Sequence, residues 1–224
     1  MTAIGFDIVA FDLDGTLVDA APDIATALNR ALEELDRKTI PENEVIGMVG
    51  HGARALIRKG LAATGGATEP LVDQALAAFM DHYARHICVR TRPYEGAEEA
   101  MDALIESGAA LAICTNKPEA LTRSLIDALG WSDRFKAIVG GDTLGARKPD
   151  PAPLHAAITA AGGGKAIFVG DSITDADTAR AAGIPLVAVS FGYADRPAGE
   201  LGADAVIDHF DALVPTIRSL AGRG

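Results

Sequence analysis

Hydrophobic residues follow two different patterns along the chain. Between residues 20 and 90 they recur every three or four positions, which places them on one face of a helix. We predict helices beginning at Pro22, after Pro41, at Ala53 and at Leu71, the last reaching Ile87. No strand-like run is recognised before Ala109, so this part of the chain is predicted to be entirely helical.

Outside this part, short continuous hydrophobic runs alternate with helical patterns. The runs are rich in Val, Ile and Ala and stop at glycine or polar residues, as expected for strands buried on both faces of a parallel sheet. The alternation predicts crossover helices between the strands. The predicted strands are 8–11, 109–114, 137–139, 166–169, 185–189 and 205–207, and the predicted helices are 96–107, 117–129, 151–161, 173–182 and 211–220.

Together these patterns predict an α/β protein with a Rossmann-like parallel sheet, helices on both faces of the sheet, and an inserted all-α domain. We place the α/β core in residues 1–19 and 91–224 and the helical domain in residues 20–90. Linkers are expected near residues 18–20 and 90–93. In the alternative arrangement, the four helices flank the sheet and form no separate domain.

The composition allows a large core and narrows the range of partners. Hydrophobic residues make up 49% of the 224 residues, which is enough to bury a substantial core. The net charge of −11 argues against nucleic acid and anionic membranes as partners, because both are negatively charged. No leader-like segment or membrane-length apolar run is recognised, so we expect a cytoplasmic protein. The sequence leaves both a monomer and a homodimer open.

Asp12 and Asp14 follow the first predicted strand, where ligands bind in open α/β sheets. Gly15 allows the chain to bend after them, so that both carboxylates can face one pocket. Two carboxylates at such close quarters repel each other, and a Mg²⁺ ion would relieve the repulsion because it prefers oxygen ligands and retains sites for water and phosphate. Taken alone, the pair also fits an ordinary Asp-rich turn.

Polar residues follow the other predicted strands as well. Thr115, Asn116 and Lys117 follow the second strand of the sheet. Lys148 lies in the loop after the third, and Asp171 follows the fourth. Parallel strands end at the same edge of a sheet, so these residues are expected to converge. Singly, each also fits a helix cap or a solvated loop residue.

As a group, the residues at the strand ends meet the requirements of phosphoryl transfer through a carboxylate. That chemistry needs a nucleophile, a proton donor, a divalent cation and donors for the phosphoryl oxygens. The first-strand carboxylates supply the nucleophile and the proton, Asp171 a further metal ligand, and Thr115 and Lys148 the donors. Asp175, one helical turn after Asp171, is predicted to bind a metal-coordinated water or to orient Lys148.

Four of these segments, in this order, resemble the signature motifs of the haloacid-dehalogenase superfamily of phosphotransferases. They are Asp-Leu-Asp-Gly-Thr-Leu at 12–17, Thr115-Asn116, Lys148-Pro149, and Gly170-Asp171-Ser172 with Asp175. The helical part resembles the α-helical cap of that superfamily. The resemblance covers essentially the whole chain and implies a Mg²⁺-dependent phosphatase acting on a small phosphorylated metabolite.

The resemblance also implies a role for each motif residue. Asp12 would form an aspartyl-phosphate, and Asp14 would protonate the leaving oxygen and then activate the hydrolytic water. Mg²⁺ would be held by Asp12, the backbone carbonyl of Asp14, and Asp171. Dehalogenases and phosphonate-cleaving members lack the second aspartate, so Asp14 favours phosphate esters as substrates. The residues expected beside the phosphate are Gly15, Thr16 and Asn116.

Further segments resemble the phosphoglycolate phosphatases within this superfamily. They are Val49-Gly50-His51-Gly52-Ala53-Arg54, and Val139-Gly140-Gly141-Asp142 leading into Arg147-Lys148-Pro149-Asp150-Pro151. This resemblance makes 2-phosphoglycolate the leading substrate. Relatives with similar caps act on other phosphates, so a sugar-phosphate phosphatase, a β-phosphoglucomutase-like mutase and a pyrophosphatase remain alternatives. A non-catalytic phosphate-binding protein is a further alternative of a different class.

The turn at residues 50–52 opens a predicted helix, whose first N–H groups are free to bind an anion such as a substrate carboxylate. Arg54, in the first turn of that helix, is placed to pair with the same group. We therefore include His51, Gly52 and Arg54 among the candidate substrate-binding residues. The alternative is an ordinary helix-capping turn with Arg54 exposed to solvent.

Overall fold

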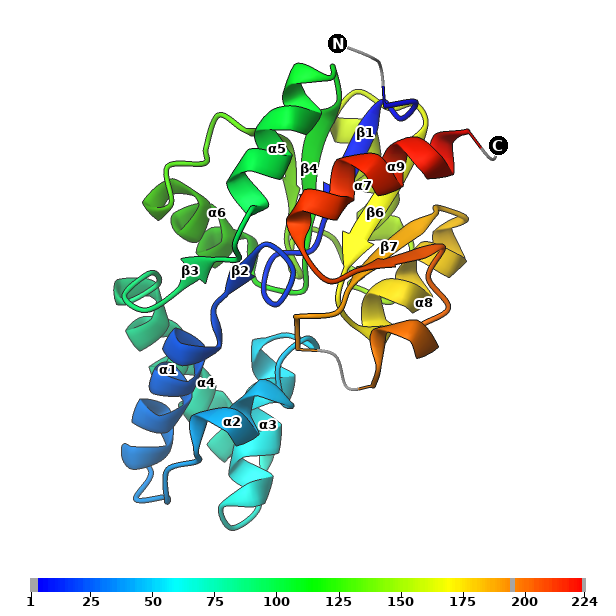
Figure 1. Ribbon diagram of the computed structural model, residues 1–224. Coiled ribbons are helices and arrows are strands. Elements are labelled where there is room, and N and C mark those ends of the chain that lie inside the picture. Colours follow the sequence, from blue (N-terminus) through cyan, green and yellow to red (C-terminus); the bar gives the residue numbers. More distant parts are fainter. Residues whose placement is uncertain (1–3, 194–195, 223–224) are drawn as a thin grey trace.

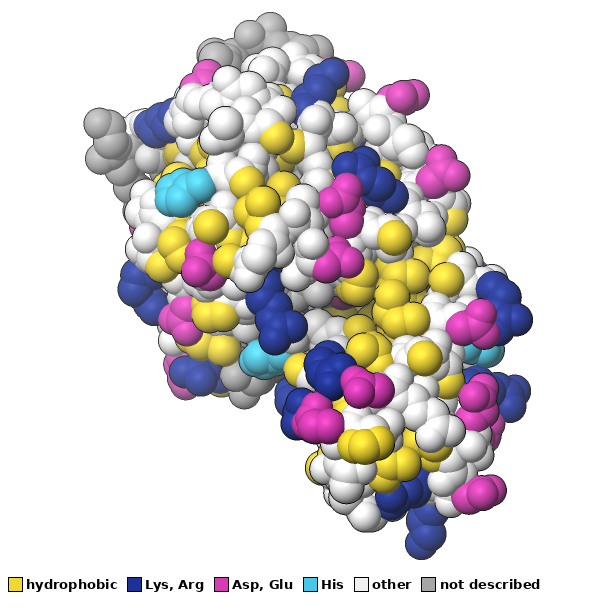
Figure 2. Space-filling view, turned by 180° about the vertical axis from the view of Figure 1, so that it is seen from behind, with side chains coloured by type: hydrophobic (Ala, Val, Ile, Leu, Met, Phe, Trp, Pro, Cys, Tyr) yellow, Lys and Arg dark blue, Asp and Glu magenta, His cyan; other side chains and the backbone are white. Residues whose placement is uncertain are grey.

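The computed structural model describes residues 4–193 and 196–222 and consists of two lobes joined by a narrow waist (Figure 1). The larger lobe is built around a sheet with helices on both faces, and the smaller lobe is helical. Seen from behind, hydrophobic side chains gather where the two lobes meet (Figure 2). None of the helices in the described ranges combines the length and the apolar character that a membrane crossing requires.

The elements follow the predicted order closely. The strands are β1 (Ile8–Phe11), β2 (Val18–Asp19), β3 (Arg92–Pro93), β4 (Ala110–Cys114), β5 (Phe135–Val139), β6 (Ala166–Gly170), β7 (Leu186–Val189) and β8 (Ala205–Ile207). The helices are α1 (Ala21–Glu33), α2 (Glu42–Ile46), α3 (Ala53–Ala63), α4 (Glu69–Arg85), α5 (Ala97–Glu106), α6 (Glu119–Ala128), α7 (Ala152–Ala160), α8 (Ile173–Ala182) and α9 (Leu213–Ala221). Short 3₁₀ turns lie at η1 (Ala198–Glu200) and η2 (Phe210–Ala212).

In the described part of the chain, six strands form one parallel sheet in the order β5-β4-β1-β6-β7-β8. From β1 the chain continues to β4 and β5 on one side and then crosses to β6, β7 and β8 on the other. The strand order therefore reverses at β1, and ligands of open α/β sheets bind at such a switch point. This arrangement confirms the predicted Rossmann-like α/β class.

Alternate residues of the strands pack on opposite faces of the sheet, as the two-residue period of a strand requires. Val9 and Phe11 of β1 belong to the face covered by α5, α6 and α9, whereas Ile8 and Ala10 belong to the face covered by α7 and α8. All four side chains are buried. Burial on both faces explains why β1 appears in the sequence as a continuous hydrophobic run.

The helical insert α1 to α4 shares one hydrophobic core with a face of the sheet. Leu28 and Leu32 of α1, Ile57 of α3 and Phe79 of α4 are buried in the same cluster as the sheet residues that α5, α6 and α9 cover. The predicted helices of residues 20–90 are thus confirmed, and the insert stands apart from the sheet as a cap (Figure 1).

The expectation that no strand occurs between the first strand and Ala109 is wrong in one respect. The two predicted linkers pair as the short antiparallel strands β2 and β3, with Val18 opposite Pro93 and Asp19 opposite Arg92. Two residues are too few to produce a hydrophobic period, so no strand pattern is visible in the sequence there. The pairing holds the two chain crossings between the lobes side by side.

Side chains reinforce both crossings. Next to β3, the buried carboxylate of Asp23 accepts hydrogen bonds from the backbone N–H groups of Arg90 and Thr91 and from the Thr91 hydroxyl, at 2.8 to 3.0 Å. Next to β2, the Tyr193 hydroxyl accepts hydrogen bonds from the N–H groups of Ala20 and Ala21 at 2.6 and 2.8 Å. The waist is therefore a specific structure and not a loose linker.

Candidate active site

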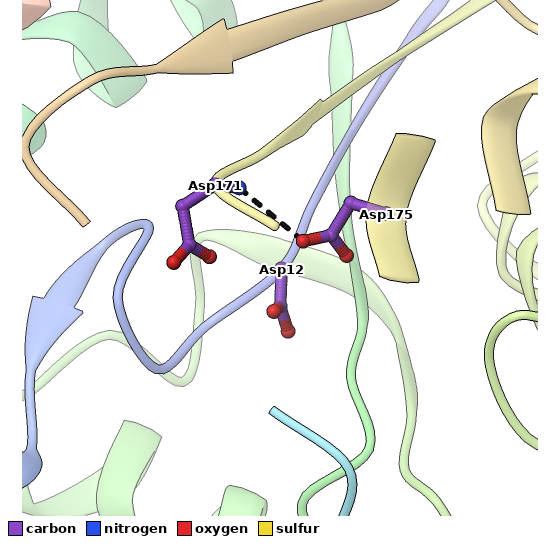
Figure 3. Close-up of side chains that lie close together, drawn as sticks. All are labelled: Asp12, Asp171 and Asp175. Carbon is purple, nitrogen blue, oxygen red and sulfur yellow. Dashed lines mark hydrogen bonds between the residues drawn. The ribbon is translucent and has the colours of Figure 1, made fainter. Parts of the chain in front are cut away.

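Three buried carboxylates converge at the carboxyl edge of the sheet. Asp12 follows β1, Asp171 follows β6, and Asp175 lies in the first turn of α8, and the three side chains lie close together (Figure 3). One carboxylate oxygen from each lies within 4.8 Å of the others. The predicted convergence of polar residues at the strand ends is thus present at the switch point of the sheet.

Asp175 is occupied by partners within the protein. Its Oδ2 accepts hydrogen bonds from the N–H groups of Asp171 and Ser172, at 3.2 and 3.1 Å, and from the Ser172 hydroxyl at 2.7 Å. Its Oδ1 accepts one from Lys148 Nζ at 2.6 Å. The Ser172 and Asp175 pair also forms a capping box that begins α8. These contacts make Asp175 a group that positions its neighbours.

Asp171 is held in place by two loops. Its Oδ1 accepts a hydrogen bond from the Thr16 hydroxyl at 3.0 Å, and its Oδ2 accepts one from the Tyr193 N–H at 2.7 Å. Gly15 lies so close that a Cβ there would come within 2.6 Å of Asp171 Oδ2. Gly15 also has a φ of +88°, so only glycine fits this turn comfortably.

Lys148 lies between two of the carboxylates. Its Nζ is 3.0 Å from Asp12 Oδ1 and 2.6 Å from Asp175 Oδ1, and its side chain is 1% exposed. The Asp12 Oδ1 contact is an ion pair without hydrogen-bond alignment, so this buried oxygen is left with no hydrogen bond. Burial by itself lowers the pKa of Lys148, but the two carboxylates outweigh burial and the pKa rises above its usual value.

The cluster is short of positive charge. Burial raises the pKa of Asp12 to about 6, with a contribution from the charge of Asp175 and opposition from Lys148. Burial and the charges of Asp175 and Asp12 raise the pKa of Asp171 well above 3.8. A divalent metal ion would relieve both effects, and the all-oxygen donor set with the orphaned Asp12 Oδ1 fits such an ion.

Asp14 faces a different set of neighbours. Lys117, in the loop after β4, donates from Nζ to both carboxylate oxygens of Asp14 at 3.0 Å. The same Nζ contacts the hydroxyl of Tyr83, from α4 of the cap, at 2.6 Å. The Lys117 side chain is 3% exposed and that of Asp14 is 12% exposed. Lys117 therefore contacts Asp14 of the core and Tyr83 of the cap at the same time, in a buried position.

A cavity of about 50 Å³ lies between the sheet edge and the cap. Its polar lining includes the side chains of Asp12, Asp14, Thr115 and Asn116 from the core. Asn116 Nδ2 also donates to the backbone carbonyl of Gly50 in the cap at 3.0 Å, which ties the cap turn to the core. The apolar lining residues include Ile24, Leu56, Phe79 and Leu121.

The comparisons with known proteins agree with this geometry. The family model of haloacid dehalogenase-like hydrolases matches residues 6–183. The chain belongs to the haloacid dehalogenase-like hydrolase family. The match spans the strands that carry Asp12, Asp14, Lys148 and Asp171, and it includes the whole helical cap.

Named relatives within this hydrolase family are similar over nearly the whole chain. The chain is 48% identical to the phosphoglycolate phosphatase of Mesorhizobium japonicum over 92% of each chain. It is 45% identical to the phosphoglycolate phosphatase of Rhodospirillum rubrum, over 92% of this chain and 88% of that one. A crystal structure titled as a predicted phosphoglycolate phosphatase from Haemophilus somnus matches with a TM-score of 0.89 and 30% identity, over 95% of this chain and 98% of that one.

The cap residues suggested for substrate binding do not all face the cavity of this hydrolase. Gly52 lines it, whereas His51 is exposed and lies outside the lining. Arg54 pairs with Asp73 and Glu69 of α4 at 2.7 and 2.8 Å and also lies outside the lining. In the free protein, the Arg54 charge is thus balanced by the cap itself.

Sequence reasoning assigned no role to three residues at the candidate site. Lys117 pairs with Asp14, and Tyr83 contacts Lys117. Tyr193 donates its backbone N–H to Asp171, and its hydroxyl accepts the Ala20 N–H at the cap hinge. Lys117 gave a usable signal, because it follows Asn116 directly at a strand end. Tyr83 falls on the hydrophobic stripe of its helix, so the sequence assigns it to the core.

Proposed function

We propose that the protein is a Mg²⁺-dependent phosphatase that hydrolyses 2-phosphoglycolate to glycolate and phosphate. The observation that carries the proposal is the meeting of Asp12, Lys148 and Asp171 at the strand switch point, with Asp14 beside them and the cap above. The similarity to phosphoglycolate phosphatases over more than nine tenths of the chain supports the substrate.

We assign the metal site to Asp12, Asp171 and the backbone carbonyl of Asp14, with Asp175 behind them. When bound, Mg²⁺ would offset the negative charge of the carboxylates and of the phosphoryl group. Asp175 fits the outer position because both of its oxygens already accept hydrogen bonds from the protein.

In the proposed reaction, the Asp12 carboxylate attacks phosphorus and becomes an aspartyl-phosphate, while Asp14 protonates the departing glycolate oxygen. Asp14, now ionised, then takes a proton from the water that attacks phosphorus, which regenerates Asp12 and releases phosphate. Thr115 and Lys148 donate to the phosphoryl oxygens, and Gly15, Thr16 and Asn116 shape the surrounding loops. Lys148 is suited to this role because Asp12 and Asp175 keep it charged although it is buried.

We divide the chain into a catalytic core, residues 1–19 and 91–224, and a cap, residues 20–90. The crossings lie at β2 and β3, and the cap supplies Gly50, Gly52 and Tyr83 to the cavity wall. A cap in this position excludes water while the phosphoryl group is transferred.

The lining of the cavity favours an organic phosphate over pyrophosphate. Its apolar residues, Ile24, Leu56, Phe79 and Leu121, offer a surface that an organic group can contact. Pyrophosphate has no such group. A sugar-phosphate phosphatase and a β-phosphoglucomutase-like mutase remain the alternatives that the substrate panel separates.

The proposal is tested by measuring phosphate release with Mg²⁺ across a panel of phosphate esters and pyrophosphate. We expect 2-phosphoglycolate to give the highest kcat/KM and glycolate to appear in equal amount to phosphate. A sugar phosphate at the top of the ranking would overturn the substrate assignment. Rearranged sugar phosphate in place of free phosphate would indicate a mutase.

The matched control is Asp12→Asn, which preserves the shape of the side chain and removes its nucleophilic charge. We expect turnover of every ester in the panel to fall to background. No phosphate release by the wild-type protein, with Mg²⁺ binding intact, would favour the non-catalytic alternative.

A further inference from the structure

The proposed substrate carries a carboxylate, and the cavity offers a limited choice of cations to receive it. Among the described residues that line the cavity, Lys117 is the one with a positive charge. Arg54 points to Glu69 and Asp73 on the cap surface, and Lys148 is engaged by Asp12 and Asp175 below the cavity. Lys117 is therefore the cation that a second anion on the substrate can reach.

Lys117 can turn toward a second anion without losing its present partners. Its Nζ is 3.0 Å from both oxygens of Asp14, so one N–H can keep the contact with Asp14 while another donates to a substrate carboxylate. The Lys117 side chain is 3% exposed, and a hydrogen bond between charged groups is strong in such a buried setting.

Tyr83 completes the recognition site from the cap side. Its hydroxyl accepts a hydrogen bond from Lys117 Nζ at 2.6 Å, which leaves the phenolic proton available for donation. No acceptor for that proton lies within hydrogen-bond distance among the described residues. Burial raises the pKa of Tyr83 well above 10, so the phenol stays protonated.

The position of this pair also sets the distance between the leaving oxygen and the anion. A general acid must lie within hydrogen-bond distance of the leaving oxygen, and Lys117 Nζ is 3.0 Å from that same acid. A carboxylate one carbon away from the leaving oxygen, as in 2-phosphoglycolate, therefore falls beside Lys117 and Tyr83. The apolar wall formed by Ile24, Leu56 and Phe79 strengthens the attraction by excluding water.

We propose that Lys117 of the core and Tyr83 of the cap together bind the substrate carboxylate and determine the specificity for a phosphorylated 2-hydroxy acid. The proposal rests on the phosphatase function proposed above and assigns its substrate recognition to two residues. Tyr83 comes from the cap, so carboxylate binding also joins the cap to the core.

The test compares 2-phosphoglycolate with its carboxamide, which keeps the phosphate and nearly the same shape but replaces the carboxylate by a neutral amide. We expect wild-type kcat/KM to favour the acid by about 100-fold, because a hydrogen-bonded charge pair is worth roughly one to two factors of ten. Lys117→Met should bring the ratio close to one, and Tyr83→Phe, which keeps the ring, should lower it about tenfold. Arg54→Met is the matched control and should change the ratio by less than about twofold.

Equal losses on the acid and the amide in both variants would overturn the proposal, because they would mean that Lys117 and Tyr83 only orient Asp14. Loss of the preference in Arg54→Met would overturn it in favour of the cap arginine. The Tyr83→Phe result stands even if Lys117→Met does not fold.

Calorimetric binding to Asp12→Asn protein separates this proposal from the phosphatase function. A preference for acid over amide that disappears when Lys117→Met is added supports the recognition site even if the wild type releases no phosphate. Equal affinity for acid and amide overturns the recognition site even if the enzyme is an active phosphatase.

Discussion

Asp12 and Asp14 are separated by one residue but lie in different electrostatic surroundings. Asp12 faces Lys148 and two other carboxylates, whereas Asp14 is paired with Lys117. Two carboxylates in distinct environments can take distinct roles in one reaction. We accordingly propose that Asp12 attacks phosphorus and that Asp14 transfers the protons.

Asp14→Asn should stop the reaction after the first chemical step when the leaving group is good. p-Nitrophenolate departs without protonation, so Asp12 is phosphorylated, but the hydrolytic water then lacks its base. We expect a burst of about one nitrophenolate per enzyme and then a rate about 10²–10⁴-fold below wild type. Stopped-flow absorbance measures the burst, and a steady rate near that of wild type would refute the role of Asp14.

The motif carboxylates were predictable because strand ends are visible in the sequence. Asp12 and Asp171 each follow a continuous hydrophobic run, and parallel strands bring such ends together. The contact between Lys117 and Asp14 was not predictable, because the position of a residue in a loop does not show where its side chain points. The suggestion that Arg54 meets the substrate failed to anticipate Glu69 and Asp73, which lie one helix away and pair with it.

At the scale of elements, the cap hinge and the metal-site carboxylates share one residue. Tyr193 donates its backbone N–H to Asp171, and its hydroxyl lies 2.6 Å from both Asp19 Oδ1 and the Ala20 nitrogen. The hinge and the loop that holds Asp171 are therefore joined through one residue. The sequence offers no sign of this link, because Asp19 and Ala20 lie more than 150 residues before Asp171 and Tyr193.

Tyr193→Phe should loosen the first crossing without removing the ring. The hydroxyl makes hydrogen bonds to the amides of Ala20 and Ala21, and each is worth about 0.5–1.5 kcal/mol. We expect these two amides to exchange with deuterium about tenfold faster or more. Amides of α9, far from the hinge, serve as the internal control, and unchanged exchange at Ala20 and Ala21 would show that the hydroxyl does not restrain the crossing.

At the scale of the whole molecule, the cap and the sheet were predictable because they differ in hydrophobic period. Helical spacing over residues 20–90 and continuous runs elsewhere separate the lobes without any knowledge of contacts. The pairing of β2 and β3 was not predicted, because strands of two residues show no hydrophobic period. The hydrogen bond between Asn116 and Gly50 was not predicted, because it depends on how the cap is oriented on the core.

The whole molecule should be more stable with Mg²⁺, and more so at neutral than at acidic pH. The pKa of Asp12 is about 6 in the metal-free folded protein, whereas an aspartate side chain in an unfolded chain has a pKa of 3.8. Its stabilising contribution is therefore complete below pH 3.8 and lost as the pH rises through about 6, a change of about 3 kcal/mol. A bound cation removes this penalty.

Thermal unfolding with Mg²⁺ or with a chelator measures the effect. We expect Mg²⁺ to raise the Tm by about 4 °C or more at pH 7.5 and by less at pH 5. Asp171→Asn is the control and should abolish most of the Mg²⁺ response. An equal response in that variant would place the metal elsewhere.

The central claim is that Asp12 carries the phosphoryl group during turnover. Mass spectrometry of enzyme quenched in acid during steady-state hydrolysis of 2-phosphoglycolate tests it most directly. We predict a phosphoryl group on the peptide containing Asp12 and none in Asp12→Asn. With p-nitrophenyl phosphate, whose leaving group needs no proton, Asp14→Asn should carry a greater amount than wild type. Active enzyme with no phosphorylated peptide in either wild type or Asp14→Asn, or with the phosphoryl group on another residue, would contradict the account.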